Sequence, residues 1–161
     1  MNWAHVHLMV NHVPVLGTVA LTLLLAWALS RGARELSRLA LWGTVVLAVA
    51  TVPVYLTGEP AEGQIEHLPG VSENLIHEHE EAAEAGLIAV LVSGALAAGA
   101  LWLSSRGQRA AGPLAALTLA GLLVSAGLFA WTAWTGGPIR HGELRGGAAG
   151  EAGAAPMVER H

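Results

Sequence analysis

The chain of 161 residues suits a single domain, but its composition excludes an ordinary soluble one. Of its residues 53% are hydrophobic and 12% are charged, whereas soluble domains carry about 25% charged residues. The net charge of −4 and the lack of a basic run argue against nucleic acid as a partner. Cysteine is absent, which rules out disulfides, zinc–thiolate sites, Cys-ligated clusters and thioether-linked heme, so histidine, glutamate, methionine or backbone must hold any metal or heme.

Four apolar stretches, each near the length of about 20 residues that a membrane-spanning helix needs, predict an all-α integral membrane four-helix bundle in residues 1–142. The predicted spans are residues 10–29, 39–57, 82–103 and 113–135. The first is not expected to be a cleavable signal peptide, because no basic segment precedes it and no small-residue cleavage site follows. The Gly/Ala-rich tail 143–161 is predicted to be flexible.

The first span opens with "HLMVNHVP", in which His7 and His12 lie five residues apart. Five residues turn a helix by about 140° from the starting face, so the two imidazoles are not expected to share a face. Pro14 predicts a helix start or a kink near residues 11–13. His12 either bonds a backbone carbonyl near Pro14 or acts as a ligand, and the cost of about 2–3 kcal/mol for an ionisable group inside a span favours a ligand.

The loop after the first span and the loop after the third are short and rich in arginine, whereas the loop 58–81 has none. The arginines of the two short loops are Arg31, Arg34, Arg38, Arg106 and Arg109. The positive-inside rule therefore places both short loops in the cytoplasm. Both termini and the long acidic second loop then face outward, into the periplasm if the membrane is a bacterial inner membrane.

The second span carries a polar stripe that leads toward the outward end of the bundle. Thr44, Thr51 and Tyr55 lie on this stripe, and its continuation reaches Glu59 and Glu62. Pro60 is expected to interrupt the regular helix there. The stripe thus directs one or two carboxylates at the outward end of the interior.

The third span contains two histidines that fall on different faces. His79 shares a face with small residues such as Ala83 and Gly86, which is typical of surfaces where membrane helices pack closely, so His79 is expected to face the interior. His77 aligns with Glu81 on a stripe that is either solvated or able to chelate an ion at i, i+4 spacing.

The fourth span begins after Pro113, which suits a first helical turn, and Gly136-Gly137-Pro138 is predicted to end it. Arg140 and His141 follow directly. Four tryptophans lie near span ends, as expected of an interfacial aromatic belt. These are Trp42, Trp102, Trp131 and Trp134.

The order of these motifs resembles an uncharacterised family of four-helix bacterial integral membrane proteins, with the pattern H-x4-H-x-P, T-G-x-x, H and G-G-x-x-x-H-G. In this chain the pattern is carried by His7 to Pro14, Thr57-Gly58-Glu59, His79 and Gly136 to Gly142. Members of that family look like b-type heme or metal-binding membrane subunits, some of them joined to cytochrome c modules. The resemblance implies a role in electron transfer, with a periplasmic cytochrome or a larger membrane complex as partner, and no defined enzymatic reaction.

Three hypotheses follow from the histidines that gather on the outward side. In the first, a b-type heme is held by two imidazoles on facing helices, with Arg140 near its propionates. The cofactor-binding residues are then drawn from His7, His12, His79, His141 and Arg140.

In the second hypothesis a single Zn, Cu or Fe ion takes mixed imidazole and carboxylate ligands. Its ligands are drawn from His12, His79, His141, Glu59 and Glu62. In the third, the chain is a structural or assembly subunit of a larger membrane complex and its histidines have no ligand. The lipid bilayer is the partner that all three hypotheses share.

Overall fold

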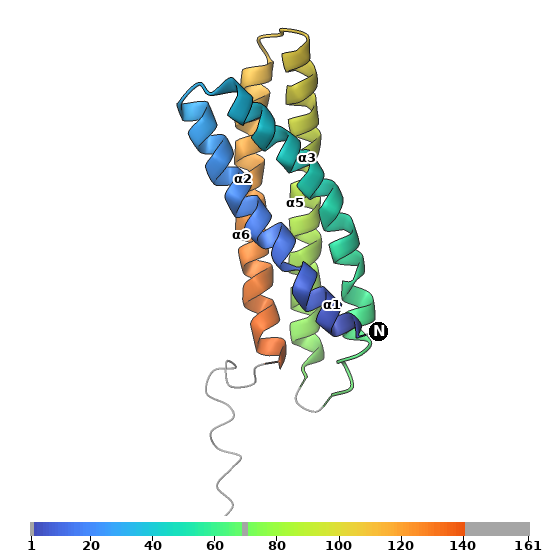
Figure 1. The fold of residues 1–161 in the computed structure, drawn as a ribbon. Coiled ribbons are helices and arrows are strands. Elements are labelled where there is room, and N and C mark those ends of the chain that lie inside the picture. The colour runs from blue at the N-terminus through green and yellow to red at the C-terminus, as the bar shows by residue number, and fades with distance from the viewer. Residues whose placement is uncertain (1, 69–70, 141–161) are drawn as a thin grey trace, which may run out of the picture.

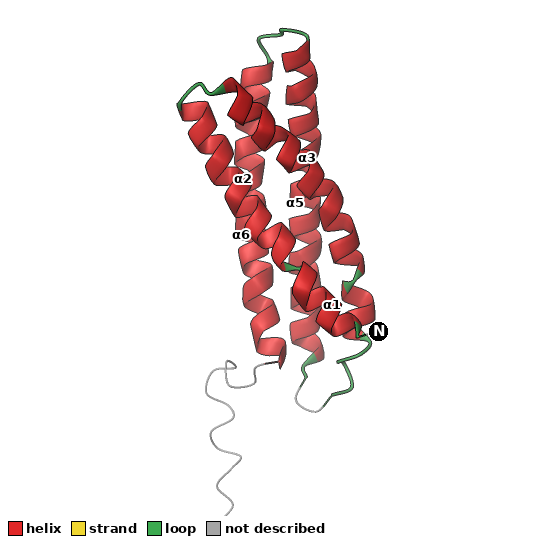
Figure 2. Ribbon diagram, viewed as in Figure 1, coloured by secondary structure: helices red, strands yellow, loops and turns green. Residues whose placement is uncertain are grey.

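The computed structural model describes residues 2–68 and 71–140. These residues form six helices and no strand (Figure 2). The helices are α1 (Trp3–Val10), α2 (His12–Ser30), α3 (Arg34–Leu56), α4 (Gly58–Glu62), α5 (Glu73–Ser105) and α6 (Ala111–Arg140). Four helical segments are long and apolar enough to cross a membrane, with mean hydropathies of 2.0–2.1. The prediction of an all-α bundle is confirmed for the described residues, and the four predicted spans fall within helical segments that are long and apolar enough to cross a membrane.

The four long helices α2, α3, α5 and α6 run alternately up and down and form an elongated bundle (Figure 1). Sequential neighbours pack together, and α2 also packs against α6, which closes the ring in the order α2, α3, α5, α6. The short helix α1 packs mainly against the short helix α4. This contact places the N-terminal segment beside the loop between α3 and α5.

The first span is divided into α1 and α2 at Asn11. Pro14 explains the division, because it has no N–H to donate to the carbonyl of Val10 one turn earlier. The break lies within the segment that the sequence predicts. The Asn2 side chain accepts a hydrogen bond of 3.0 Å from the His5 backbone N–H and caps the start of α1.

Helix α6, which corresponds to the fourth predicted span, is longer than expected. The prediction that Gly136-Gly137-Pro138 ends it is wrong, because α6 continues to Arg140. Pro138 lies in the last turn, where it removes only the one bond its N–H would make to the Trp134 carbonyl. Ile139 is 7% exposed, so its burial favours continuing the helix for one more turn.

Small residues allow the bundle helices to approach closely. A Cβ placed on Gly94 of α5 would lie 2.5 Å from the Cβ of Ala48 on α3, and one placed on Gly121 of α6 would lie 2.5 Å from Ser93 Oγ on α5. Such small-residue contacts are characteristic of membrane helix interfaces. The buried hydroxyls inside the bundle donate to carbonyls of their own helices and remain satisfied. They include Thr18, Thr44, Thr51, Ser93, Thr118 and Ser125.

The outer surface of the bundle is apolar. Large side chains such as Leu16, Leu23 and Val49 are more than 60% exposed, as expected of side chains that face lipid. All six tryptophans are exposed by at least a third, and the most exposed is Trp134 at 80%. Each of the two arginine-bearing hairpins turns through a glycine with positive φ, Gly32 at 62° and Gly107 at 64°. At both, the backbone N–H groups return to the preceding helix in a Schellman motif.

Candidate functional site

Two histidines from distant parts of the chain lie side by side at the end of the bundle opposite the arginine hairpins. The imidazole of His7 comes from α1 and that of His79 from the first third of α5. Their ring centroids are 6.4 Å apart and their planes are nearly perpendicular, at 84°. Both rings are partly buried. We call these two residues the histidine pair.

The ring of His7 is oriented by the residue that links α3 to α4. Its Nδ1 lies 2.8 Å from Thr57 Oγ1, and that hydroxyl donates its proton to the carbonyl of Val54 at 2.6 Å. A hydroxyl has one proton to donate, so at this contact Thr57 accepts and His7 Nδ1–H donates. Gly58 next to it contributes no side chain, and a Cβ there would lie 3.9 Å from the His7 ring.

The ring of His79 lies against the backbone of α6. Its Nδ1 is 2.9 Å from the carbonyl oxygen of Thr132, and a carbonyl can only accept, so Nδ1–H is again the donor. Thr135 Oγ1 lies farther away, at 3.5 Å. Gly136 makes the close approach possible, because a Cβ at that position would lie 3.0 Å from two atoms of the imidazole. The small-residue face of α5 therefore directs His79 at its neighbour helix, as its periodicity predicts.

The two hydrogen bonds select the same tautomer in both rings. With the proton on Nδ1, a neutral imidazole carries its lone pair on Nε2. Neither Nε2 has a hydrogen-bond partner among the described residues. No fully buried polar side-chain atom of the described residues lacks a partner, so neither Nε2 is fully buried. An Nδ1–H held by a backbone or hydroxyl oxygen is the arrangement that orients metal-ligating histidines. In this tautomer each ring of the histidine pair carries its lone pair on Nε2.

The other histidines of this end are not part of the pair. His12 is exposed at the start of α2, and its Nδ1–H donates to the Leu8 carbonyl at 2.9 Å. That contact is the backbone bond that the sequence leaves open as the alternative to a ligand role. His77 and His67 are exposed and lie 3.3 Å from Glu81 and Glu66, respectively. His5 is exposed on α1.

The predicted carboxylate ligands do not complete a metal site with the histidine pair. Glu59 is exposed on α4, whereas Glu62 is partly buried and lies close to the Glu80 side chain of α5. Within residues 2–68 and 71–140, no three histidine or glutamate side chains are grouped closely enough to hold a metal ion. His12, Glu59 and Glu62 are therefore not assembled around His79 in this structure.

The side chains of two predicted site residues, Arg140 and His141, lie outside the part of the chain that the structure describes. Arg140 is the last residue of α6, but its side chain is outside the described part of the chain. His141 lies outside the described residues altogether. Their proposed contacts with heme propionates or a metal ion remain predictions.

Sequence reasoning did not assign the residues that orient the two rings. Thr57 belongs to the T-G-x-x motif and Gly136 to the G-G-x-x-x-H-G motif, but their roles depend on the packing of α4 against α1 and of α6 against α5. The available signal was composition: a threonine at the end of one span and a glycine pair at the end of another both allow a backbone or hydroxyl oxygen to approach an imidazole.

No model of a known protein family, no curated protein and no solved structure matches the chain. The resemblance to heme or metal-binding membrane subunits is therefore carried only by the motifs themselves, and the function has to be argued from the histidine pair.

Proposed function

We propose that this protein is a multi-pass subunit of a bacterial inner membrane that binds a b-type heme through His7 and His79 and takes part in electron transfer. The observation that carries the proposal is the geometry of the histidine pair. Two imidazoles on opposite sides of one metal, each bound at about 2 Å, have ring centroids about 6 Å apart. The observed separation is 6.4 Å, and each Nδ1–H is bound to an oxygen atom rather than to the other ring.

The donor set favours heme over a bare ion. A heme iron takes only two axial ligands from the protein, because the macrocycle supplies the other four. A structural metal ion such as Zn²⁺ takes four protein ligands, and a catalytic one takes three. The described residues bring together two imidazoles and no third ligand, which meets the first requirement and not the second.

The residues of this chain would hold and tune the group, whose chemistry is reversible one-electron transfer at iron. His7 and His79 would bind through Nε2, while Thr57 and the Thr132 carbonyl keep the proton on Nδ1. By accepting the Nδ1–H bonds, the two oxygens would raise the basicity of the imidazoles, which in a bound heme would favour the oxidised state. A single Zn, Cu or Fe ion that recruits His141 as a third ligand is the alternative form of the site.

The orientation and location belong to the same proposal. The arginines of the two short hairpins support a cytoplasmic position for that end of the bundle. The histidine pair and the long acidic loop 58–81 then face the periplasm, where a cytochrome or another subunit of a membrane complex could contact them.

The test is the absorbance of the full chain purified in mild detergent from cells supplied with heme precursor. We expect a Soret band that shifts on reduction with dithionite. His7→Ala and His79→Ala should each lose the band. His77→Ala, an exposed histidine two residues away on α5, is the matched control and should retain it.

A second variant at His79 distinguishes loss of a ligand from misfolding of the protein. His79→Met keeps an axial ligand and should retain heme with a raised reduction potential, because methionine raises the potential of a His-ligated heme. Retention of heme by both alanine variants, or wild-type protein that neither contains nor takes up heme, would overturn the heme assignment. Colourless protein with one equivalent of metal by mass spectrometry would instead select the ion, and His79→Ala would then have to lose it.

A further inference from the structure

We propose that the groove between α3 and α5 at the arginine-bearing end of the bundle binds an anionic phospholipid. This groove has a volume of about 400 Å³ and is open on one side. We call it the arginine-end groove. Its lining includes Arg38, Trp42, Val45, Leu101, Trp102 and Ser105. It lies at the end of the bundle opposite the histidine pair, so the inference is independent of the proposed function.

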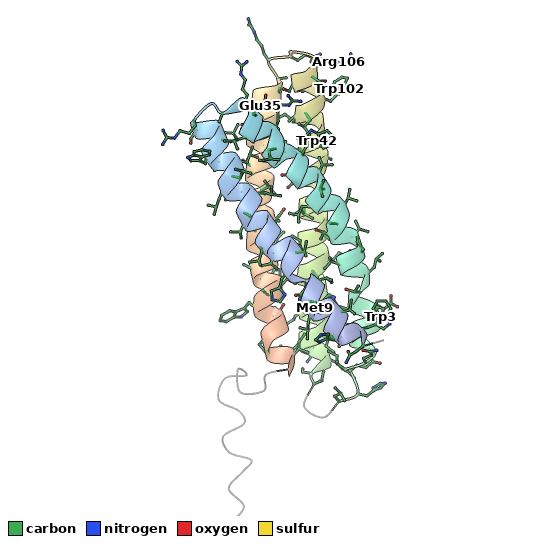
Figure 3. All side chains as sticks on the ribbon, viewed as in Figure 1. Trp3, Met9, Glu35, Trp42, Trp102 and Arg106 are labelled. Atoms are coloured by element: carbon green, nitrogen blue, oxygen red, sulfur yellow. The ribbon has the colours of Figure 1, made fainter. Side chains whose placement is uncertain are left out.

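The mouth of the groove is positively charged. Arg38 lines it, and the guanidinium carbon of Arg106 lies 4.6 Å from the centre of the Trp102 ring (Figure 3). This stacking holds a cation against Trp102, which lines the groove. Arginine presents a planar set of donors that matches a phosphate group. The hydroxyl of Ser104, which makes no hydrogen bond to any described residue, adds a further donor at the same rim.

Among the described residues, the carboxylate paired with Arg38 does not neutralise this charge. Glu35 is the one glutamate of the sequence between residues 1 and 58, and it lies 3.7 Å from Arg38. Its side chain is 88% exposed and that of Arg38 is 57% exposed. An exposed pair of this kind contributes little and is easily exchanged. A phosphate in the groove would therefore meet arginines that are available to it.

The walls indicate a lipid as the source of that phosphate. Val45, Ala98 and Leu101 form an apolar surface below the charged rim, and the groove lies between two helices apolar enough to span a membrane. Trp42 and Trp102 are 56% and 54% exposed, as tryptophans at the headgroup level are. A basic rim above an apolar wall between spanning helices fits a headgroup with its acyl chain.

The experiment is native mass spectrometry of the full chain, released from detergent micelles that contain equimolar phosphatidylglycerol and phosphatidylcholine with identical acyl chains. The wild-type protein should retain phosphatidylglycerol in preference. Arg38→Gln with Arg106→Gln should lower the ratio of retained lipids at least about fivefold, the effect of a single basic residue at an anionic surface.

Arg31→Gln with Arg109→Gln is the matched control, because these two arginines lie on the same end but neither lines the groove, as Arg38 does, nor stacks on Trp102, as Arg106 does. This control should keep the preference, and equal loss in both double variants would overturn the site in favour of diffuse attraction. Ala98→Phe adds bulk at the apolar wall without changing charge. It should also reduce lipid retention, and full retention by this variant or the absence of any preference in wild-type protein would likewise overturn the proposal.

Discussion

At the scale of single residues, the histidine pair depends on oxygen atoms that fix its tautomer. Thr57 is the clearest case, because its hydroxyl is engaged on both sides: it accepts from His7 Nδ1–H and donates to the Val54 carbonyl. The corresponding oxygen for His79 belongs to the backbone and cannot be removed by exchanging a side chain. The two histidines therefore differ in how sensitive they are to mutation of their surroundings.

Under the proposed function, Thr57→Val is expected to weaken binding of the heme or metal ion about 10–100-fold, the usual effect of removing a residue that orients a metal-ligating histidine. Valine has nearly the same shape, so the loss should come from the missing acceptor for His7 Nδ1–H. The measurement is heme retention, or metal retention if an ion is found, by titration against a competing binder. Thr57→Ser, which restores the hydroxyl, should recover most of the affinity.

The matched control for this prediction is Thr132→Val. It makes the same chemical change on α6, but the Thr132 hydroxyl bonds the Leu128 carbonyl and the His79 contact is to the backbone oxygen. Affinity should therefore be unchanged in this variant. Equal losses from both threonines would show that the effect comes from packing rather than from the orientation of His7.

The sequence indicated the position of His79 better than that of its neighbour in the pair. The helical period of α5 places His79 on a small-residue face, and period alone predicts its contact with another helix. His7 lies in an eight-residue helix whose packing against α4 is a long-range contact. His12 looked the more deeply placed by sequence, but the break at Asn11 leaves it exposed. Periodicity cannot predict the packing of His7 against α4 or the exposure of His12, because both depend on where the first span breaks.

At the scale of helices, close packing is concentrated where glycine meets a small side chain. Gly94 on α5 is an example: an added Cβ would lie 2.5 Å from the Cβ of Ala48 on α3. Alanine has no flexible end that could move aside, so the two backbones would have to separate. The hydropathy of the sequence predicts these helices but does not specify which of the many small residues make the contact.

Gly94→Ala is expected to destabilise the bundle by about 1–3 kcal/mol, the usual cost of inserting a methyl group into a packed interface. Unfolding of the detergent-solubilised protein by heat or by added sodium dodecyl sulfate would measure the change. The double variant Gly94→Ala with Ala48→Gly removes the opposing methyl group. It should recover most of the lost stability, and a coupling energy between the two positions can be calculated from the cycle.

Gly127→Ala on α6 serves as the control, since nothing lies within 4 Å of a Cβ at that position. The substitution should leave stability unchanged or raise it by up to about 1 kcal/mol through helix propensity. A loss of stability at Gly127 as large as that at Gly94 would contradict the packing argument.

At the scale of the whole molecule, the two ends of the bundle differ in chemistry. The end that carries the two short hairpins has five arginines, while the end with α1 and α4 has the histidine pair and most of the glutamates (Figure 1). The amino-acid order alone predicted this division, because each hairpin reverses the chain and the charges alternate with it. The arginine-end groove and the histidine pair are consequently separated by the length of the apolar region.

This asymmetry predicts how the protein sits in the membrane. The absence of cysteine means that single cysteines can be introduced without background. Asn74→Cys lies in the first turn of α5 at the histidine end, and Gln108→Cys lies in the hairpin between α5 and α6; both native side chains are exposed. In intact cells whose outer membrane is permeable to the reagent, a membrane-impermeant maleimide should label Asn74→Cys and not Gln108→Cys.

Opening the inner membrane should make Gln108→Cys reactive to the same degree, which controls for an unreactive thiol. Labelling of Gln108→Cys alone in intact cells would show that the orientation is the reverse of the predicted one. The histidine pair would then face the cytoplasm, and the proposed electron partner would have to be a cytoplasmic one. Labelling of both cysteines in intact cells would contradict a membrane crossing by α5, because the two positions lie at opposite ends of that helix. The arginines of the opposite end predict that this end stays on the cytoplasmic side, and the labelling pattern tests that prediction.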